Sequence, residues 1–122
     1  MFGVEAHENV VNCAEFSADA RVIASGSQDY TAKIWDVLSG KMTRTFTCQD
    51  SVNCVRFNPS NTGVATASDD FCVKLWDLRL ERVIADFIGH KSPTTSVAFH
   101  PNGNYLVSSS RGNIVKLWDL RR

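Results

Sequence analysis

The 122-residue sequence has no long apolar run, only three prolines and no excess of charge of either sign. Its apolar stretches are a few residues long, which is too short to cross a bilayer. Thirteen basic side chains balance thirteen acidic ones, so the chain lacks the field that attracts nucleic acids or anionic membranes. We therefore expect no nucleic-acid partner and no membrane partner. The N-terminus, MFGVEAHENV, lacks the basic and apolar regions of a secretory signal, which predicts an intracellular protein, cytoplasmic or nuclear.

The sequence also lacks the cysteine and glycine patterns of metal and nucleotide sites. Its four cysteines, Cys13, Cys48, Cys54 and Cys72, include no C-x-x-C pair and no zinc-type spacing. Its glycines are scattered and never form a phosphate-binding loop before a helix. We expect no metal and no cofactor. Cys13 and Cys54 occupy equivalent places in an internal repeat, so we interpret them as small buried strand residues and not as a disulfide pair.

That repeat is the strongest pattern in the sequence. Three segments align without gaps, beginning at Val11, Val52 and Thr94. In each segment a phenylalanine precedes a tryptophan by 19 positions, and successive tryptophans are 41 and 42 positions apart. The pairs are Phe16 with Trp35, Phe57 with Trp76, and Phe99 with Trp118. Such a period indicates a repeat architecture in which each unit packs on its neighbours.

Within each unit, short alternating or apolar runs are separated by turn residues, which predicts strands and no helix. The first strand is expected at 11–16, 52–57 and 95–99, and the second at 22–26, 64–67 and 105–109. The third is expected at 32–37, 72–78 and 114–120, and a fourth, outer strand at 42–47 and 82–88. We interpret residues 1–122 as a single domain with units at about 7–47, 48–89 and 90–122.

A Trp-Asp dipeptide closes the third strand of every unit, at Trp35-Asp36, Trp76-Asp77 and Trp118-Asp119. Four antiparallel strands every 40 to 45 residues that end in Trp-Asp resemble the WD-repeat β-propeller family over essentially the whole chain. The resemblance implies an all-β fold of three four-stranded antiparallel units. It also implies a non-enzymatic scaffold that binds partner proteins or peptides through propeller loops.

The resemblance further implies a buried hydrogen-bond relay in each unit, from a loop histidine through a turn aspartate and a strand hydroxyl to the tryptophan. The first unit has all four members: His7, Ser25, Asp29 and Trp35. The second has Thr66, Asp70 and Trp76, with Cys48 in the place of the histidine. The third has His90, Ser108 and Trp118, with Gly112 in the place of the aspartate. Two of the three relays are therefore expected to be broken.

Histidine, aspartate and serine are also the residue types of a catalytic triad. Here their spacing repeats with the unit, the set ends on a tryptophan N–H, and no nucleophile-elbow sequence accompanies it. A satisfied polar network that specifies the fold accounts for the same residues. We therefore predict no catalytic residue.

Two surfaces are candidates for partner binding. On the family pattern, the residue before each turn aspartate faces one end of the channel, with the residues that lead into the first strands nearby. These positions are Gln28, Asp69, Arg111, Asn9, Ser51 and Ser92. The other candidate is VKLWDLR, which occurs at 73–79 and 115–121. These tandem W-D-x-R boxes resemble those of substrate-receptor subunits of cullin ubiquitin ligases, in which case Arg79 and Arg121 would dock on the adaptor.

A closed propeller needs about four to eight units, and this sequence supplies three. An open stack would expose two apolar faces and unpaired strand edges. Segment 2–5 is expected to be the end of an outer strand, and the last unit stops before its fourth strand. We therefore expect self-association, most simply as two chains that close a six-bladed ring, or completion by the remaining blades of a longer propeller.

Overall fold

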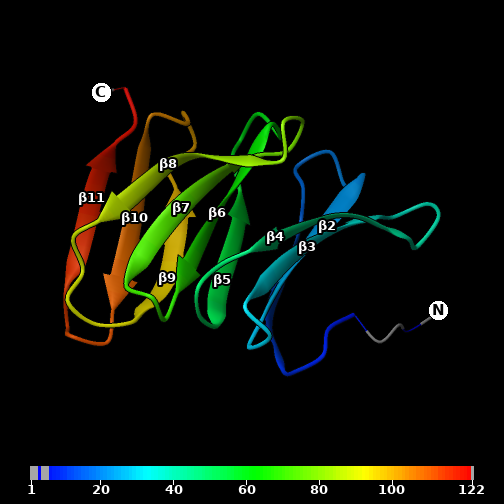
Figure 1. Cartoon of the computed structure of the whole chain (residues 1–122). Helices are drawn as coiled ribbons and strands as arrows, with labels where there is room; N and C mark the ends of the chain where they lie inside the picture. The colour runs from blue at the N-terminus through cyan, green and yellow to red at the C-terminus, as the bar shows by residue number, and fades with distance from the viewer. Residues whose placement is uncertain (1–2, 4–5, 122) are drawn as a thin grey trace.

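The computed structural model describes residues 3 and 6–121 and confirms an all-β fold. The described residues form three antiparallel sheets that follow one another along the chain (Figure 1). The first contains β1 (Val11–Phe16), β2 (Val22–Ser27), β3 (Thr31–Asp36) and β4 (Met42–Thr47). The second contains β5 (Val52–Phe57), β6 (Gly63–Ser68), β7 (Cys72–Asp77) and β8 (Arg82–Ile88). The third contains β9 (Thr94–Phe99), β10 (Tyr105–Ser110) and β11 (Val115–Asp119).

The third sheet has three strands among the described residues, which are the three that were expected for the last unit. Its order is β11-β10-β9, and no fourth strand pairs with β11 among the described residues. Of segment 2–5, in which the end of an outer strand was expected, all but Gly3 lies outside the described residues. Elsewhere the strands begin and end within one residue of the predicted bounds, because turn residues set both ends of each run. The described residues contain no helix that could span a membrane.

One residue with left-handed backbone sets the turn between the second and third strands of each sheet. Tyr30, Phe71 and Asn113 occupy equivalent repeat positions and have φ of 77°, 74° and 64°. In the first two sheets the aspartate before this residue accepts a hydrogen bond from a backbone N–H two positions further along, at 3.0 Å in both. This short-range bond stabilises the turn, as aspartate commonly does.

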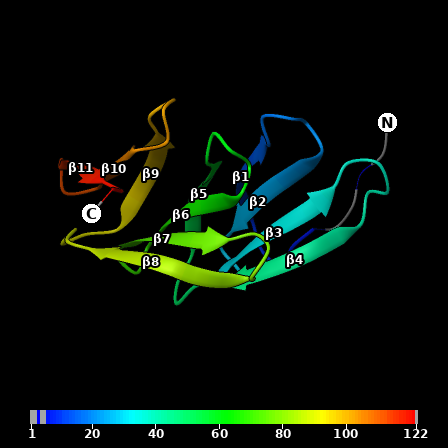
Figure 2. The ribbon, with the colours of Figure 1, turned by 90° about the horizontal axis from the view of Figure 1, so that it is seen from above.

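The sheets stack face to face, with β1, β5 and β9 as their adjacent inner strands (Figure 2). One apolar core lies between the first and second sheets and includes Ile34 and Val55. A second core lies between the second and third sheets and includes Val73 and Leu106. The second sheet is covered on both faces, whereas the first and third are covered on one. All six residues of β6 are buried as a result.

Candidate functional site

The polar relay of the first sheet is fully connected. His7 Nδ1 lies 2.9 Å from Asp29 Oδ2, and His7 Nε2 lies 2.7 Å from Ser25 Oγ. Trp35 Nε1 donates to the same Ser25 hydroxyl at 3.0 Å. The His7 side chain is completely buried, and that of Asp29 is 10% exposed. The arrangement links a loop, a turn and two strands through polar groups that all have partners.

Asp29 is the most heavily bonded member of this relay. Its carboxylate accepts the Thr31 hydroxyl at 2.5 Å, the Thr31 backbone N–H at 3.0 Å and the Glu8 backbone N–H at 3.2 Å. Burial opposes ionisation of Asp29, but the hydrogen bonds from Thr31 and His7 outweigh it and lower its pKa below the ordinary value. Asp29 is therefore ionised at neutral pH.

The second sheet has an acceptor without a donor. Trp76 Nε1 donates to Thr66 Oγ1 at 3.0 Å, as in the first sheet. Cys48 stands in the place of the histidine, and its sulfur is 3.8 Å from Thr66 Oγ1. Asp70 Oδ2 is buried without a hydrogen-bond partner. Burial raises the pKa of the Cys48 thiol to about 11, so this side chain carries no charge at neutral pH.

The third sheet has the opposite defect. His90 Nε2 lies 2.7 Å from Ser108 Oγ, and Trp118 Nε1 donates to that hydroxyl at 2.8 Å. Gly112 stands in the place of the aspartate, and His90 Nδ1 is buried without a partner. Burial, and after it the charge of Lys116, lowers the pKa of His90, so its ring is neutral at pH 7.

The relays do not offer a catalytic nucleophile. The separation of 2.7 Å between His7 Nε2 and Ser25 Oγ would fit a base and a hydroxyl nucleophile. The Ser25 residue, however, is only 5% exposed, and its oxygen already accepts the Trp35 N–H. A substrate cannot reach this oxygen in the folded chain. Among the described residues no group of histidine, cysteine, aspartate and glutamate side chains is placed to hold a metal ion.

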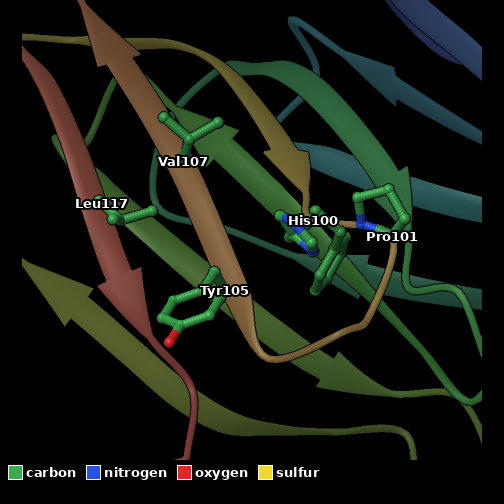
Figure 3. A pocket seen from close by; sticks show the side chains of 6 residues that line it. His100, Pro101, Tyr105, Val107 and Leu117 are labelled. Atoms are coloured by element: carbon green, nitrogen blue, oxygen red, sulfur yellow. The ribbon is translucent and has the colours of Figure 1, made fainter.

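The outer face of the third sheet is apolar and open. Val107, Val115 and Leu117 are 37%, 71% and 71% exposed. With Tyr105, His100 and neighbouring side chains, Val107 and Leu117 line an open cavity of about 400 Å³ (Figure 3). The cavity is shallow and lies on a sheet face, which is the form of a packing surface more than of a small-molecule pocket.

Repeat equivalence identifies what normally covers this face. The residues equivalent to Val107, Val115 and Leu117 are buried in the first sheet by contact with the second, and are largely buried in the second by contact with the third. In the first sheet they are Ala24 and Ala32, both 0% exposed, and Ile34, 3% exposed; in the second they are Ala65 and Val73, both 0% exposed, and the half-buried Leu75. The face therefore corresponds to the sheet faces that, inside the chain, pack on the next sheet.

The opposite end of the stack has a matching open face. Phe16 is 60% exposed, whereas its equivalent Phe57 is 7% exposed beneath the first sheet. Ile23 is half-buried, and its equivalents Val64 and Leu106 are 0% exposed. The two ends of the stack therefore expose different faces. The face exposed on the third sheet corresponds to the face that packs on the next sheet inside the chain, and the face exposed on the first sheet corresponds to the face that receives that contact.

The profile of the WD domain, G-beta repeat family matches this chain over residues 2–36, 40–77 and 81–119. The chain belongs to this family. Each matched segment ends on the aspartate of a Trp-Asp dipeptide, and together the segments cover most of the sequence. The three sheets are accordingly WD-repeat blades. The WD-repeat fold is generally a scaffold for protein interaction, and membership of the family supports that general role for this chain.

Individual relatives match over about one repeat. WD repeat-containing protein 18 of Bos taurus is 46% identical over 41 residues, which cover 34% of this chain and 10% of that protein. Nuclear distribution protein nudF of Aspergillus oryzae is 46% identical over 44 residues, covering 36% of this chain and 10% of the relative. Periodic tryptophan protein 2 of Arabidopsis thaliana is 40% identical over 43 residues, covering 35% and 5%. The aligned segments span a tenth or less of these curated relatives.

The predicted partner-binding residues gather at one end of the WD-repeat blades. The backbone N–H groups of Gln28, Asp69 and Arg111 donate to the carbonyl just before the first strand of their own blade, at 2.9, 2.9 and 3.0 Å. These bonds place each turn beside the loop that carries Asn9, Ser51 or Ser92.

Exposure differs among the six. Gln28, Arg111 and Asn9 are exposed, and Ser92 is half-buried. Asp69 is also half-buried and accepts a hydrogen bond from Asn53 Nδ2 at 2.7 Å. Ser51 is only 8% exposed and lies under the neighbouring blade, where little of it is accessible. The accessible part of this surface therefore consists mainly of Gln28, Arg111 and Asn9.

The two W-D-x-R arginines lie on separate blades, after β7 and β11. Arg121 is engaged within its own blade: Nη2 lies 3.1 Å from Asp119 Oδ2, and the guanidinium carbon is 5.0 Å from the centre of the Tyr105 ring. Arg79 is exposed. Neither this placement nor the relatives named above favours the ubiquitin-ligase alternative.

Sequence reasoning missed an asparagine that joins neighbouring blades. Asn12 Nδ2 donates to the Val52 carbonyl at 2.9 Å, and Asn53 Nδ2 donates to the Thr94 carbonyl at the same distance. Asn12 and Asn53 are equivalent residues of the repeat, so one bond type occurs at both interfaces. The repeated VN dipeptide at 11–12 and 52–53 was the available signal.

Proposed function

We propose that this chain is a WD-repeat interaction scaffold that closes its ring with a second copy of itself and presents its loop-end surface to partner proteins. The observation that carries the proposal is the exposure of Leu117 and Val115, 71% each, at positions that are buried or half-buried wherever a blade follows. Inside the chain, the faces equivalent to this one pack on the side of the next blade that carries Phe57 or its equivalent. The first blade exposes the equivalent side, which carries Phe16. A second copy can therefore supply the cover that the first lacks.

The two contacts in such a ring are identical. The open face of the third blade of one copy packs on the first blade of the other, and two-fold symmetry repeats this contact once. Each contact buries Leu117, and burial of a leucine side chain contributes about 1.5 to 3 kcal/mol. Two contacts together make Leu117 worth about 3 to 6 kcal/mol, which is at least about a 100-fold change in the dimer dissociation constant.

Light scattering across a dilution series tests this proposal. We expect a discrete dimer for the parent chain and dissociation at 100-fold or higher concentration for Leu117→Asp. Leu38→Asp is the matched control, because Leu38 is 98% exposed in the turn after β3 and belongs to neither open face. A monodisperse monomer of the parent chain would overturn closure by a second copy and would favour further blades of a longer propeller.

Gln28, Arg111 and Asn9 are the residues we assign to partner recognition at the loop end. They are exposed side chains held on turns whose backbone bonds are fixed, so binding orders little of the chain. The probe is a set of peptides that are selected, from a displayed random-peptide library, for binding to the parent chain. Their binding should be lost in Arg111→Ala and retained in Arg82→Ala, a matched exposed arginine at the start of β8. Equal binding to both variants would remove the loop end from the proposal.

A further inference from the structure

The broken relay of the third blade leaves a buried hydrogen-bonding nitrogen without a partner. His90 is 5% exposed, and its Nε2 is engaged with Ser108 at 2.7 Å. Its Nδ1 has no partner, whereas the equivalent Nδ1 of His7 lies 2.9 Å from the Asp29 carboxylate. What is missing at His90 is thus a carboxylate, because Gly112 replaces the aspartate that would supply it.

A cavity adjoins this position, and because Nδ1 itself is buried, side chains at the cavity rim must move for a carboxylate to reach it. His90, Lys91, Ser92, Gly112 and Lys116 border an open cavity of about 370 Å³. The cavity lies where the loop before β9 meets the turn between β10 and β11. A carboxylate needs only a small part of this volume, and the opening to solvent lets it enter with a larger group attached.

The surrounding charges favour an anion. Lys91 and Lys116 both border the cavity, and the charge of Lys116 acts at the His90 ring. The Nζ of Lys116 lies 6.0 Å from the centre of the Trp118 ring, close to the relay. Because the Ser108 hydroxyl accepts the Trp118 N–H and lies 2.7 Å from His90 Nε2, we assign its own proton to His90 Nε2, which places the ring proton on Nδ1. The free nitrogen is then a donor, which together with two ammonium groups suits a carboxylate.

We propose that this cavity is a carboxylate-binding site, in which a ligand carboxylate accepts the His90 Nδ1–H in the place that Asp29 fills in the first blade. The chemistry is shared by a free carboxylate anion and by the carboxylate of a partner's acidic side chain or C-terminus. The site is independent of ring closure, since all its residues lie in one blade and the loop that precedes it.

Nuclear magnetic resonance of the labelled imidazole rings tests the site directly. We expect sodium acetate, compared with chloride at equal ionic strength, to shift the His90 ring signals saturably and leave those of His7 unchanged. Gly112→Asp supplies the carboxylate from within the chain and should abolish the acetate response. Its new Cβ meets the Ser92 hydroxyl at 2.9 Å, so the Ser92 side chain must rotate and give up the hydrogen bond that it accepts from the Gly112 N–H at 2.8 Å.

The first blade offers a matched control. Asp29→Gly creates the same vacancy at His7, and acetate should then shift the His7 signals as well. The proposal is overturned if acetate gives no saturable shift at His90 in the parent chain, or if Gly112→Asp responds like the parent. The parent measurement alone decides the matter if either variant fails to fold.

Two further probes separate the sources of the carboxylate. N-acetyl-aspartate methylamide represents an acidic side chain in a polypeptide, and N-acetylglycine represents a C-terminus. A saturable His90 shift with either one supports a protein ligand. A shift with acetate alone restricts the site to small free carboxylates, and in both cases Gly112→Asp should suppress the response.

Discussion

Replacing Asp29 by alanine tests whether the complete relay stabilises the fold. The substitution removes the acceptor of the His7 ring, the Thr31 hydroxyl and two backbone N–H groups. The His7 side chain is completely buried, so its Nδ1 cannot turn to water for a substitute partner. Leaving a buried donor unpaired costs about 1 to 3 kcal/mol. Because 1 kcal/mol shifts the melting temperature of a domain of this size by about 3 to 5 °C, we expect a loss of about 3 to 15 °C.

Asp70→Ala in the second blade is the matched comparison. Asp70 holds the equivalent turn through its bond to the Cys72 N–H, but its other oxygen has no partner. Removing it breaks the turn bond and also removes an unsatisfied buried oxygen, so we expect a smaller loss than for Asp29→Ala. Calorimetric or circular-dichroism melting of the two variants gives the comparison. If both lose the same stability, the connection to His7 contributes nothing and the relay is not the stabilising unit.

Two further results are expected from the broken relays. Cys48→His should give Asp70 Oδ2 the donor that it lacks and raise the free energy of unfolding in urea by about 1 kcal/mol; a loss of stability would mean that the site near Thr66 cannot hold an imidazole. Burial, and after it the charge of Lys116, lowers the pKa of His90 in the folded chain below the value of about 6.5 in the unfolded chain. Between these two pKa values the His90 ring of the folded chain therefore binds fewer protons than that of the unfolded chain. Stability should therefore fall as the pH drops from about 6.5 through the folded pKa, and urea titrations across this range should show a shallower fall in Gly112→Asp; parallel curves would contradict this account.

The strands could be predicted from sequence because short segments of turn residues separate most of them. The spacing of 19 positions between Phe16 and Trp35 recurs in all three units, so it fixes how the sequences of the units align with one another. The partners of the relay followed from the resemblance to the WD-repeat family, and the structure brings His7, Ser25, Asp29 and Trp35 within hydrogen-bond distance of one another in sequence along the relay. Repeat position carries this information because equivalent residues share equivalent surroundings.

What alignment could not supply is the difference between equivalent residues. Leu117 and Ile34 hold the same place in the repeat, yet one is 71% exposed and the other 3%, because only one has a blade beyond it. Ser51 was grouped with Asn9 as a loop residue, but a neighbouring blade buries it. The Asn12 bond to the next blade was missed for the same reason. Contacts between units depend on which units lie next to one another in the stack, and the sequence of a single unit does not specify its neighbours.

The fully buried β6 has a consequence for how the molecule opens. In a stack where each unit contacts only its neighbours, the end units lose one interface on detaching, whereas the middle unit must lose two. Backbone amides of Gly63–Ser68 should then exchange with solvent only in rare global openings, while those of the outer units exchange through partial fraying. The chain thus has a slow centre and two faster ends, and any partner that covers an end also slows the local unfolding of the blade beneath it.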